Sequence, residues 1–129
     1  MQITVTTIIF GLPTGQHTVQ THLTLSVERL RVRELIAQKV QQEIVEYTAQ
    51  QRPGLSGEYL SPEALIRAEA HSFVPGEARL EVTRAQQAFA RRDYMIVIDN
   101  RRVFDSDEML SLRPGSRIEF IKILPLVGG

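Results

Sequence analysis

The stretch from Ser116 to Gly129 constrains the fold of this chain most, because it combines a strand with an apolar exit. Ile118 and Phe120 alternate with charged residues, which is the period of a strand with one face in a core and the other in solvent. Pro125 has no N–H to donate to a neighbouring strand, so pairing is expected to end before it. The chain is therefore expected to build a sheet from which a short apolar tail emerges.

Two glycines, Gly128 and Gly129, close this sequence. Because they lack a Cβ, another protein can close tightly around the peptide, and a free carboxylate at Gly129 can enter a narrow slot. A glycine terminus alone is weak evidence, since chain ends tolerate small residues. Its combination with a complete strand and a proline-containing exit favours a tail that is handled by another protein's active site.

Length and composition predict a single domain over residues 1–129 with one hydrophobic core. Hydrophobic residues make up 43% of the chain, and fifteen basic residues balance fifteen acidic ones. A balanced chain creates no field that attracts nucleic acid or an anionic membrane, so neither is an expected partner. The sequence shows no leader-like start and no apolar run of membrane-spanning length, which predicts a cytoplasmic protein.

Residue types that carry catalysis are scarce or scattered. The chain has no cysteine, which excludes disulfides and a cysteine nucleophile of its own. His17, His22 and His71 do not converge by spacing, so no metal site is predicted. The acidic residues of 105–108 are interpreted as a solvated turn, because the stretch lacks the spacing of a calcium loop. We therefore expect no intrinsic enzyme activity.

The first part of the chain predicts a hairpin and a helix. Residues from Gln2 to Phe10 and from His17 to Val27 are rich in β-branched residues and form two antiparallel strands with one packed face. After Leu30 apolar residues recur at three- and four-residue steps, which predicts an amphipathic helix without a clear N-terminal cap. Its apolar stripe consists of Val32, Leu35, Ile36, Val40, Ile44 and Tyr47.

Residues 50–92 are predicted to form a helical insertion. Pro-Gly and Ser-Gly pairs mark turns in its first part. Ser61 followed by Pro62 is a favourable helix start, which predicts a short helix to about Ala70. A second helix is predicted from Glu77 to Arg92. One face of that helix carries Ala78, Val82, Ala85 and Phe89.

Three strands are predicted after the insertion. The run from Tyr94 to Asp99 is apolar at its centre, which favours a position inside the sheet. A tight turn leads into Arg101–Phe104, and the final strand follows a connection over residues 106–112. In that connection Met109, Leu110 and Leu112 are expected to fill the core. To lie beside the first strand, the last one needs a crossover, which the helical middle provides. The arrangement is an α+β, β-grasp fold with a mixed sheet of about five strands and a crossing helix.

The part of the chain from Tyr94 onward resembles the ubiquitin-like superfamily, in particular the bacterial sulfur-carrier branch typified by MoaD and ThiS. The matching segments are Ile98–Val103 as the hairpin, Ser106–Leu110 as the connection, and Ile118–Gly129 as strand and tail. Residues 2–47 resemble the first hairpin and helix of the same fold. The insertion has no counterpart in the short carriers.

The resemblance implies that Gly129 carries the reactive carboxylate and that Gly128 keeps the partner's slot clear. In such families a ubiquitin-activating or ThiF-type enzyme adenylates the terminal carboxylate with ATP. The acyl group then passes to a thiol and an amine, which makes the protein a modifier of target proteins with conjugating and deconjugating enzymes as further partners. An alternative is a sulfur carrier with a C-terminal thiocarboxylate. A second alternative is a β-grasp interaction module without activation. In either carrier role the protein is a cosubstrate without a bound cofactor.

The tail and its base contain more apolar residues than one core face can use. With Ile118 and Phe120 pointing inward, Ile121 and Ile123 require either a bulge or outward exposure. One hypothesis is an exposed patch that docks the activating enzyme; the alternative is packing against the insertion. The residues expected to form this docking segment are Ile121, Ile123, Leu124, Pro125, Leu126 and Val127.

Overall fold

The computed structural model describes residues 1–12, 15–50 and 78–124 as an α+β fold. In chain order the elements are β1 (Gln2–Leu12), β2 (Gly15–Thr24), β3 (Arg29–Arg31), α1 (Val32–Gln50), α3 (Ala78–Ala90), β4 (Met95–Ile98), β5 (Arg101–Val103), β6 (Met109–Ser111) and β7 (Ile118–Ile123). The predicted hairpin, first helix, second insertion helix and last three sheet strands are thereby confirmed. The predicted helix from Ser61 to Ala70 lies outside the described residues.

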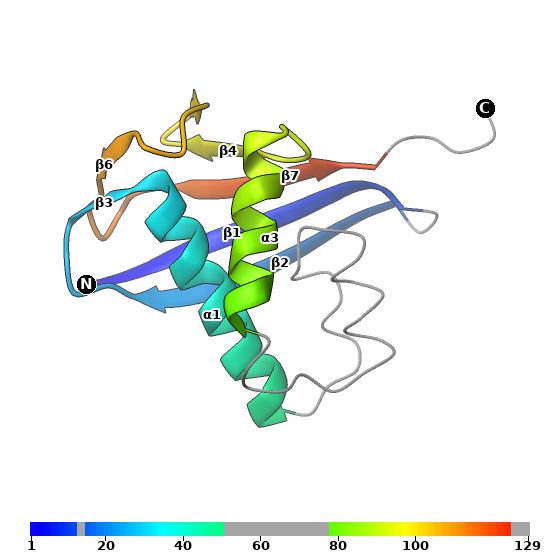
Figure 1. Ribbon diagram of the computed structural model, residues 1–129, viewed down its shortest axis with the longest axis horizontal. Coiled ribbons are helices and arrows are strands. Elements are labelled where there is room, and N and C mark those ends of the chain that lie inside the picture. The colour runs from blue at the N-terminus through cyan, green and yellow to red at the C-terminus, as the bar shows by residue number, and fades with distance from the viewer. Residues whose placement is uncertain (13–14, 51–77, 125–129) are drawn as a thin grey trace.

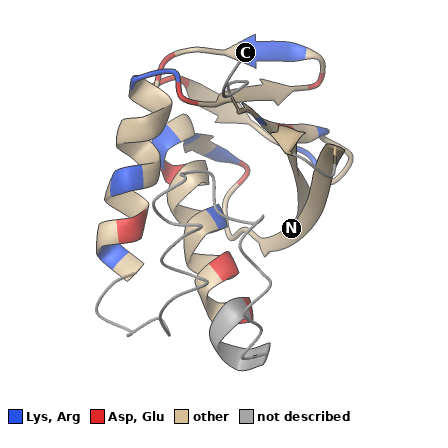
Figure 2. Cartoon of the chain, turned by 90° about the vertical axis from the view of Figure 1, so that its right-hand side faces the viewer, with Lys and Arg blue, Asp and Glu red and all other residues tan. Residues whose placement is uncertain are grey.

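Five strands form one mixed sheet in the order β2-β1-β7-β4-β5. β1 and β7 run parallel, with Val5 beside Ile118, and the other neighbouring strands are antiparallel. Figure 1 shows α1 and α3 crossing one face of this sheet, and Figure 2 shows the helices and the strands as separate layers. The expected placement of the last strand beside the first is confirmed.

The core lies between the two helices and the inner face of the sheet. On α1 the predicted stripe is buried at Val32, Leu35, Ile36, Val40 and Ile44. Alternate residues of β7, β4 and β1 meet this stripe because successive strand side chains point to opposite faces. The residues involved are Ile3, Val5 and Ile9 of β1, Ile96 and Ile98 of β4, and Ile118 and Phe120 of β7.

Charged and aromatic side chains are also part of this core. Lys39 and Glu43 of α1 are fully buried and form an ion pair. The Lys39 ammonium lies 4.9 Å from the centroid of the Phe120 ring, and Phe120 stacks on Tyr94 with 5.8 Å between ring centroids. The Tyr94 hydroxyl donates a 2.7 Å hydrogen bond to the carbonyl of Ala85. Burial raises the pKa of the Tyr94 phenol, and the Glu43 charge raises that pKa further.

The start of α1 is capped by the connection between β5 and β6 rather than by a polar cap residue. The N–H groups of Val32 and Arg33 donate to the carbonyls of Glu108 and Ser106, at 3.0 and 2.9 Å. Glu34 reaches back to accept the N–H of Arg31 at 2.8 Å, which is half of a capping box. These bonds satisfy N–H groups that otherwise lack partners at a helix start.

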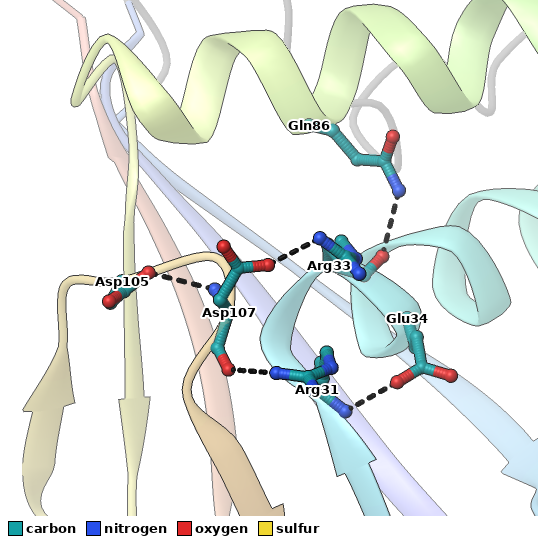
Figure 3. A network of polar contacts seen from close by, with 6 residues as sticks. All are labelled: Arg31, Arg33, Glu34, Gln86, Asp105 and Asp107. Carbon is teal, nitrogen blue, oxygen red and sulfur yellow. Dashed lines mark hydrogen bonds and ion pairs between the residues drawn. The ribbon is translucent and has the colours of Figure 1, made fainter.

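The acidic connection is held by basic side chains, as Figure 3 shows. Asp107 pairs with Arg33 and its carbonyl accepts a 2.9 Å bond from Arg31. Asp105 accepts the Asp107 N–H at 2.8 Å, and Glu108 binds Arg101 at 2.7 Å. The carboxylates therefore tie a turn together, in agreement with the interpretation of this stretch as a solvated turn.

Three details differ from the sequence prediction. The second strand was expected to run to Val27, but β2 ends at Thr24 and Val27 is 53% exposed. Met109 was expected in the core with Leu110 and Leu112, yet it is exposed while both leucines are buried. The reason is a short two-stranded sheet of β3 and β6, which was not predicted and in which alternation turns Met109 outward.

No helix in the described ranges is both long enough and apolar enough to cross a bilayer.

Candidate functional site

The base of the tail is the end of β7, a strand that is paired on both sides. Ile118 to Ile123 pair in unbroken register with β1, and Ile118 to Ile121 pair with β4. Its inward residues, Ile118, Phe120 and Lys122, are buried, and Ile123 is 60% exposed. Of the two alternatives, a bulge in β7 or outward exposure, the structure therefore shows outward exposure at Ile123. Ile121 is half-buried on the same outer face.

The irregularity lies in the neighbouring strand β1, around the predicted end of that strand at Phe10. The pairing of β1 with β2 shifts register between Ile9 and Leu12. Within this segment Gly11 has a φ of +90°, a conformation that L residues with a Cβ rarely adopt. A β-bulge of this kind ends regular pairing and redirects the backbone.

Leu124 approaches this bulge closely. Its N–H donates to the carbonyl of Phe10 at 2.9 Å. A Cβ built on Gly11 would lie 2.7 Å from the carbonyl oxygen of Leu124, which is closer than such contacts occur. Glycine is thus required here because the exiting backbone occupies the space of a side chain. Together these features fix the point at which the chain leaves the sheet.

An apolar surface, here called the outer patch, adjoins this exit. It consists of Ile8, Phe10, Met95, Val97, Ile121 and Ile123 on the sheet face opposite the helices. The register places Ile8 and Met95 on either side of Ile121, and Phe10 beside Ile123. Phe10 is 38% exposed, which makes the exit end of the patch its most accessible part.

The described helix of the insertion, α3, does not cover the outer patch. α3 and α1 contact each other and lie together on the inner face (Figure 1). The alternative for Ile121 and Ile123 was packing against the insertion. These residues do not pack against α3, because α3 lies on the opposite face of the sheet. The outer patch therefore satisfies one requirement of a docking surface, because apolar residues from three strands are grouped beside the tail base.

The structure places some of the predicted site residues and not others. Ile121, Ile123 and Leu124 lie together at the end of β7. Pro125, Leu126, Val127, Gly128 and Gly129 lie outside the described residues. No sequence prediction placed Gly11, Phe10 or Met95 at this surface, to which they contribute from β1 and β4. Only long-range strand pairing brings them there, and no local pattern reports that pairing.

No protein-family model, no curated protein and no solved structure matches this chain.

Proposed function

We propose that this chain is a ubiquitin-like β-grasp carrier whose Gly129 carboxylate is activated by a partner enzyme. One observation carries the proposal: β7 is held between β1 and β4, and its pairing ends at Leu124 directly before Pro-Leu-Val-Gly-Gly. In the sequence, an apolar segment that ends in two glycines thus follows directly on this fixed strand. The mixed sheet, with β1 parallel to β7 and a helix crossing it, is compatible with the β-grasp fold.

The chemistry requires an activating step, because a carboxylate is a poor acyl donor. A carboxylate oxygen of Gly129 attacks the α-phosphate of ATP and releases pyrophosphate, which gives an acyl adenylate. A partner's thiolate then attacks the acyl carbon and releases AMP. The chain has no cysteine of its own, so this sulfur comes from the partner. The Gly129 carboxylate is either present as such or released by cleavage.

Two fates of the activated carboxyl are distinguished by the nucleophile that follows. Attack by an amine of a target protein gives an amide and makes the chain a protein modifier, which is the function we favour. Attack of a hydrosulfide on the acyl adenylate, with release of AMP, instead gives a thiocarboxylate and makes the chain a sulfur carrier. The apolar tail is the feature that favours the sulfur carrier.

Burial of both lysines bears on the modifier function. Lys39 is fully buried in α1 and Lys122 is 8% exposed in β7. The N-terminal ammonium donates to the carbonyl of Leu25 at 2.9 Å. Because acyl transfer requires an accessible, deprotonated amine, we infer that targets receive single copies rather than chains built on this protein's lysines.

Intact-mass measurement of the protein recovered from its host tests this proposal. Amide-linked adducts on other proteins, lost when Gly129 is deleted, are the expected result. Replacement of one oxygen by sulfur at the terminus would instead establish the sulfur carrier. An unmodified terminus in all preparations, together with a Gly129 deletion that changes no adduct, would leave an interaction module without activation. A ladder of conjugates that disappears on replacing both lysines by arginine would contradict single modification.

Docking through the outer patch gives a separate prediction. Ile123→Glu places a charge at its most exposed position and is expected to reduce ATP–pyrophosphate exchange by the cognate activating enzyme about tenfold or more. Val27→Glu is the matched control, since Val27 has a similar exposure, 53% against 60%, but is not part of the patch. Equal exchange rates for the two variants would remove the docking role while leaving activation at Gly129 intact.

A further inference from the structure

The edge of the sheet opposite β2 carries a second surface, unrelated to the tail. Phe104 follows the edge strand β5 and is 54% exposed. The guanidinium carbon of Arg102 lies 4.5 Å from the centroid of its ring, and that of Arg92 lies 5.3 Å from it. We call these three residues the edge cluster. An exposed aromatic ring flanked by two cations is a typical recognition element.

Arg92 contributes to the edge cluster from an unusual backbone position. Arg92 has a φ of +65° and follows α3 in a Schellman motif, in which its N–H binds the Phe89 carbonyl and the Asp93 N–H binds the Ala88 carbonyl. Glycine occupies this position most often, because a Cβ is disfavoured at positive φ. Here an arginine occupies it, and the side chain gained reaches the Phe104 ring.

Strand β5 also presents main-chain groups that face away from the sheet. Asp99 and Asn100 both have positive φ, 50° and 67°, which is the geometry of a two-residue type I′ hairpin turn. Ile98 and Arg101 are then the hydrogen-bonded pair that closes the turn, and Val97 and Arg102 form the next, non-hydrogen-bonded pair. The N–H and C=O of Arg102 therefore point to the open edge.

Charge selects the partner that this edge would accept. Arg91 pairs with Asp93 at 2.9 Å and Arg101 pairs with Glu108 at 2.7 Å, so those two cations are compensated. Within the described part of the chain, Arg92 and Arg102 contact the ring and have no carboxylate at ion-pair distance. Figure 2 shows basic positions at the end of α3 and along the strand at the upper edge. Such an edge repels basic strands and attracts acidic ones.

We propose that β5 and the edge cluster bind an extended acidic segment of a partner protein. The segment adds a strand by pairing with the free N–H and C=O of Arg102, its carboxylates meet Arg92 and Arg102, and an apolar side chain packs on Phe104. This surface lies two strands away from β7, and the proposal does not depend on activation of the tail.

Fluorescence anisotropy with a labelled peptide of alternating valine and glutamate tests the charge requirement on the full chain. Binding at low salt is expected, with no binding of the matching valine–lysine peptide. The double variant Arg92→Ala/Arg102→Ala should bind about tenfold more weakly. Arg79→Ala/Arg113→Ala removes the same charge from exposed arginines elsewhere and should bind as the parent protein does.

Strand addition has its own test, because the outward N–H of Arg102 can be removed without breaking a bond to β4. Arg102→Pro lacks that N–H, whereas Arg102→Val lacks only the charge. Arg102→Pro should bind the acidic peptide about fivefold more weakly than Arg102→Val. Peptide-induced amide shifts should centre on residues 101–105 and 92, with the rest of the spectrum unchanged in both variants.

Several results would overturn the proposal. Equal affinity for the acidic and basic peptides, an equal loss in the Arg79/Arg113 control, or amide shifts centred elsewhere would each do so. A uridine oligonucleotide that binds the same amides more tightly than the acidic peptide would assign this edge to nucleic acid instead. Equal binding by Arg102→Pro and Arg102→Val would exclude strand addition.

Discussion

Replacing Lys39 by methionine alone is expected to lower the free energy of unfolding by about 3–5 kcal/mol. The substitution keeps much of the side-chain volume but removes the ammonium that is paired with the fully buried Glu43 carboxylate. It also removes the ammonium that lies over Phe120. Removing one partner of a buried ion pair costs more than the pair itself contributes, which is why the single substitution has a large expected effect.

Urea unfolding followed by far-ultraviolet circular dichroism measures this loss, with two variants for comparison. Lys39→Met/Glu43→Leu removes both charges and should recover most of the stability, because an apolar pair can replace a buried ion pair. Arg33→Met breaks the exposed pair with Asp107, whose side chains are 52% and 60% exposed, and should cost less than about 1 kcal/mol. Equal losses for Lys39→Met and Arg33→Met would show that burial of the pair is not what makes it important.

Replacing Gly11 by alanine is expected to destabilise the fold by about 1–3 kcal/mol and to displace the base of the tail. The residue has a φ of +90°, and its Cβ would meet the Leu124 carbonyl oxygen at 2.7 Å. Because that oxygen belongs to the backbone, relief requires moving the chain at its exit from the sheet. The hydrogen bond from the Leu124 N–H to the Phe10 carbonyl is then lost or weakened.

Gly15 offers a matched control for this prediction. It has a similar φ of +103°, yet no atom lies within 4 Å of where its Cβ would be. Gly15→Ala therefore carries the backbone cost without the clash, and the difference between the two variants isolates the close approach of Leu124. Amide exchange at Leu124 should accelerate only in Gly11→Ala. In the proposed function, ATP–pyrophosphate exchange should fall in the same variant. Identical behaviour of the two variants would contradict a role for Gly11 in placing the tail.

The strands of the sheet were predictable where the alternation of apolar and polar residues extended over enough positions. The alternating Ile118 and Phe120 indicated the inner face of β7, and the apolar centre of β4 indicated a position inside the sheet. The three-residue strands β3 and β6 were not predicted, because so few residues do not establish a period. Their pairing depends on Leu30 and Leu110, which lie far apart in the chain.

Burial of the ion pair between Lys39 and Glu43 could not be predicted from the sequence, because both residues are of types that usually face solvent. Lys39 and Glu43 follow Leu35 at four-residue steps, so helical spacing alone places them on the inner stripe. Charged residues at such positions are ordinarily read as solvent-facing, since they are rarely buried without partners. Here the two form an ion pair within one helix, a possibility that spacing and composition do not distinguish from exposure.

The geometry of the candidate site was predictable only on the β7 side. The alternation left either a bulge or outward exposure open for Ile121 and Ile123, and the structure shows outward exposure at Ile123. The contribution of Gly11 had no local signal, because a glycine that follows a strand is normally explained by a turn. Glycine is required at this position because the backbone of Leu124 lies against it, and the parallel pairing of β1 and β7 brings Leu124 there from the other end of the sequence.

The central position of β7 has a consequence for how this protein folds. Its pairing with β1 joins position 5 to position 118, so the middle of the sheet forms only after a very long loop has closed. Contacts of such wide sequence separation slow the folding of small domains. Until that closure, β2 with β1 and β4 with β5 are separate hairpins without a common sheet. We therefore expect the assembly of the tail's base to coincide with the rate-limiting step of folding, rather than with formation of either hairpin.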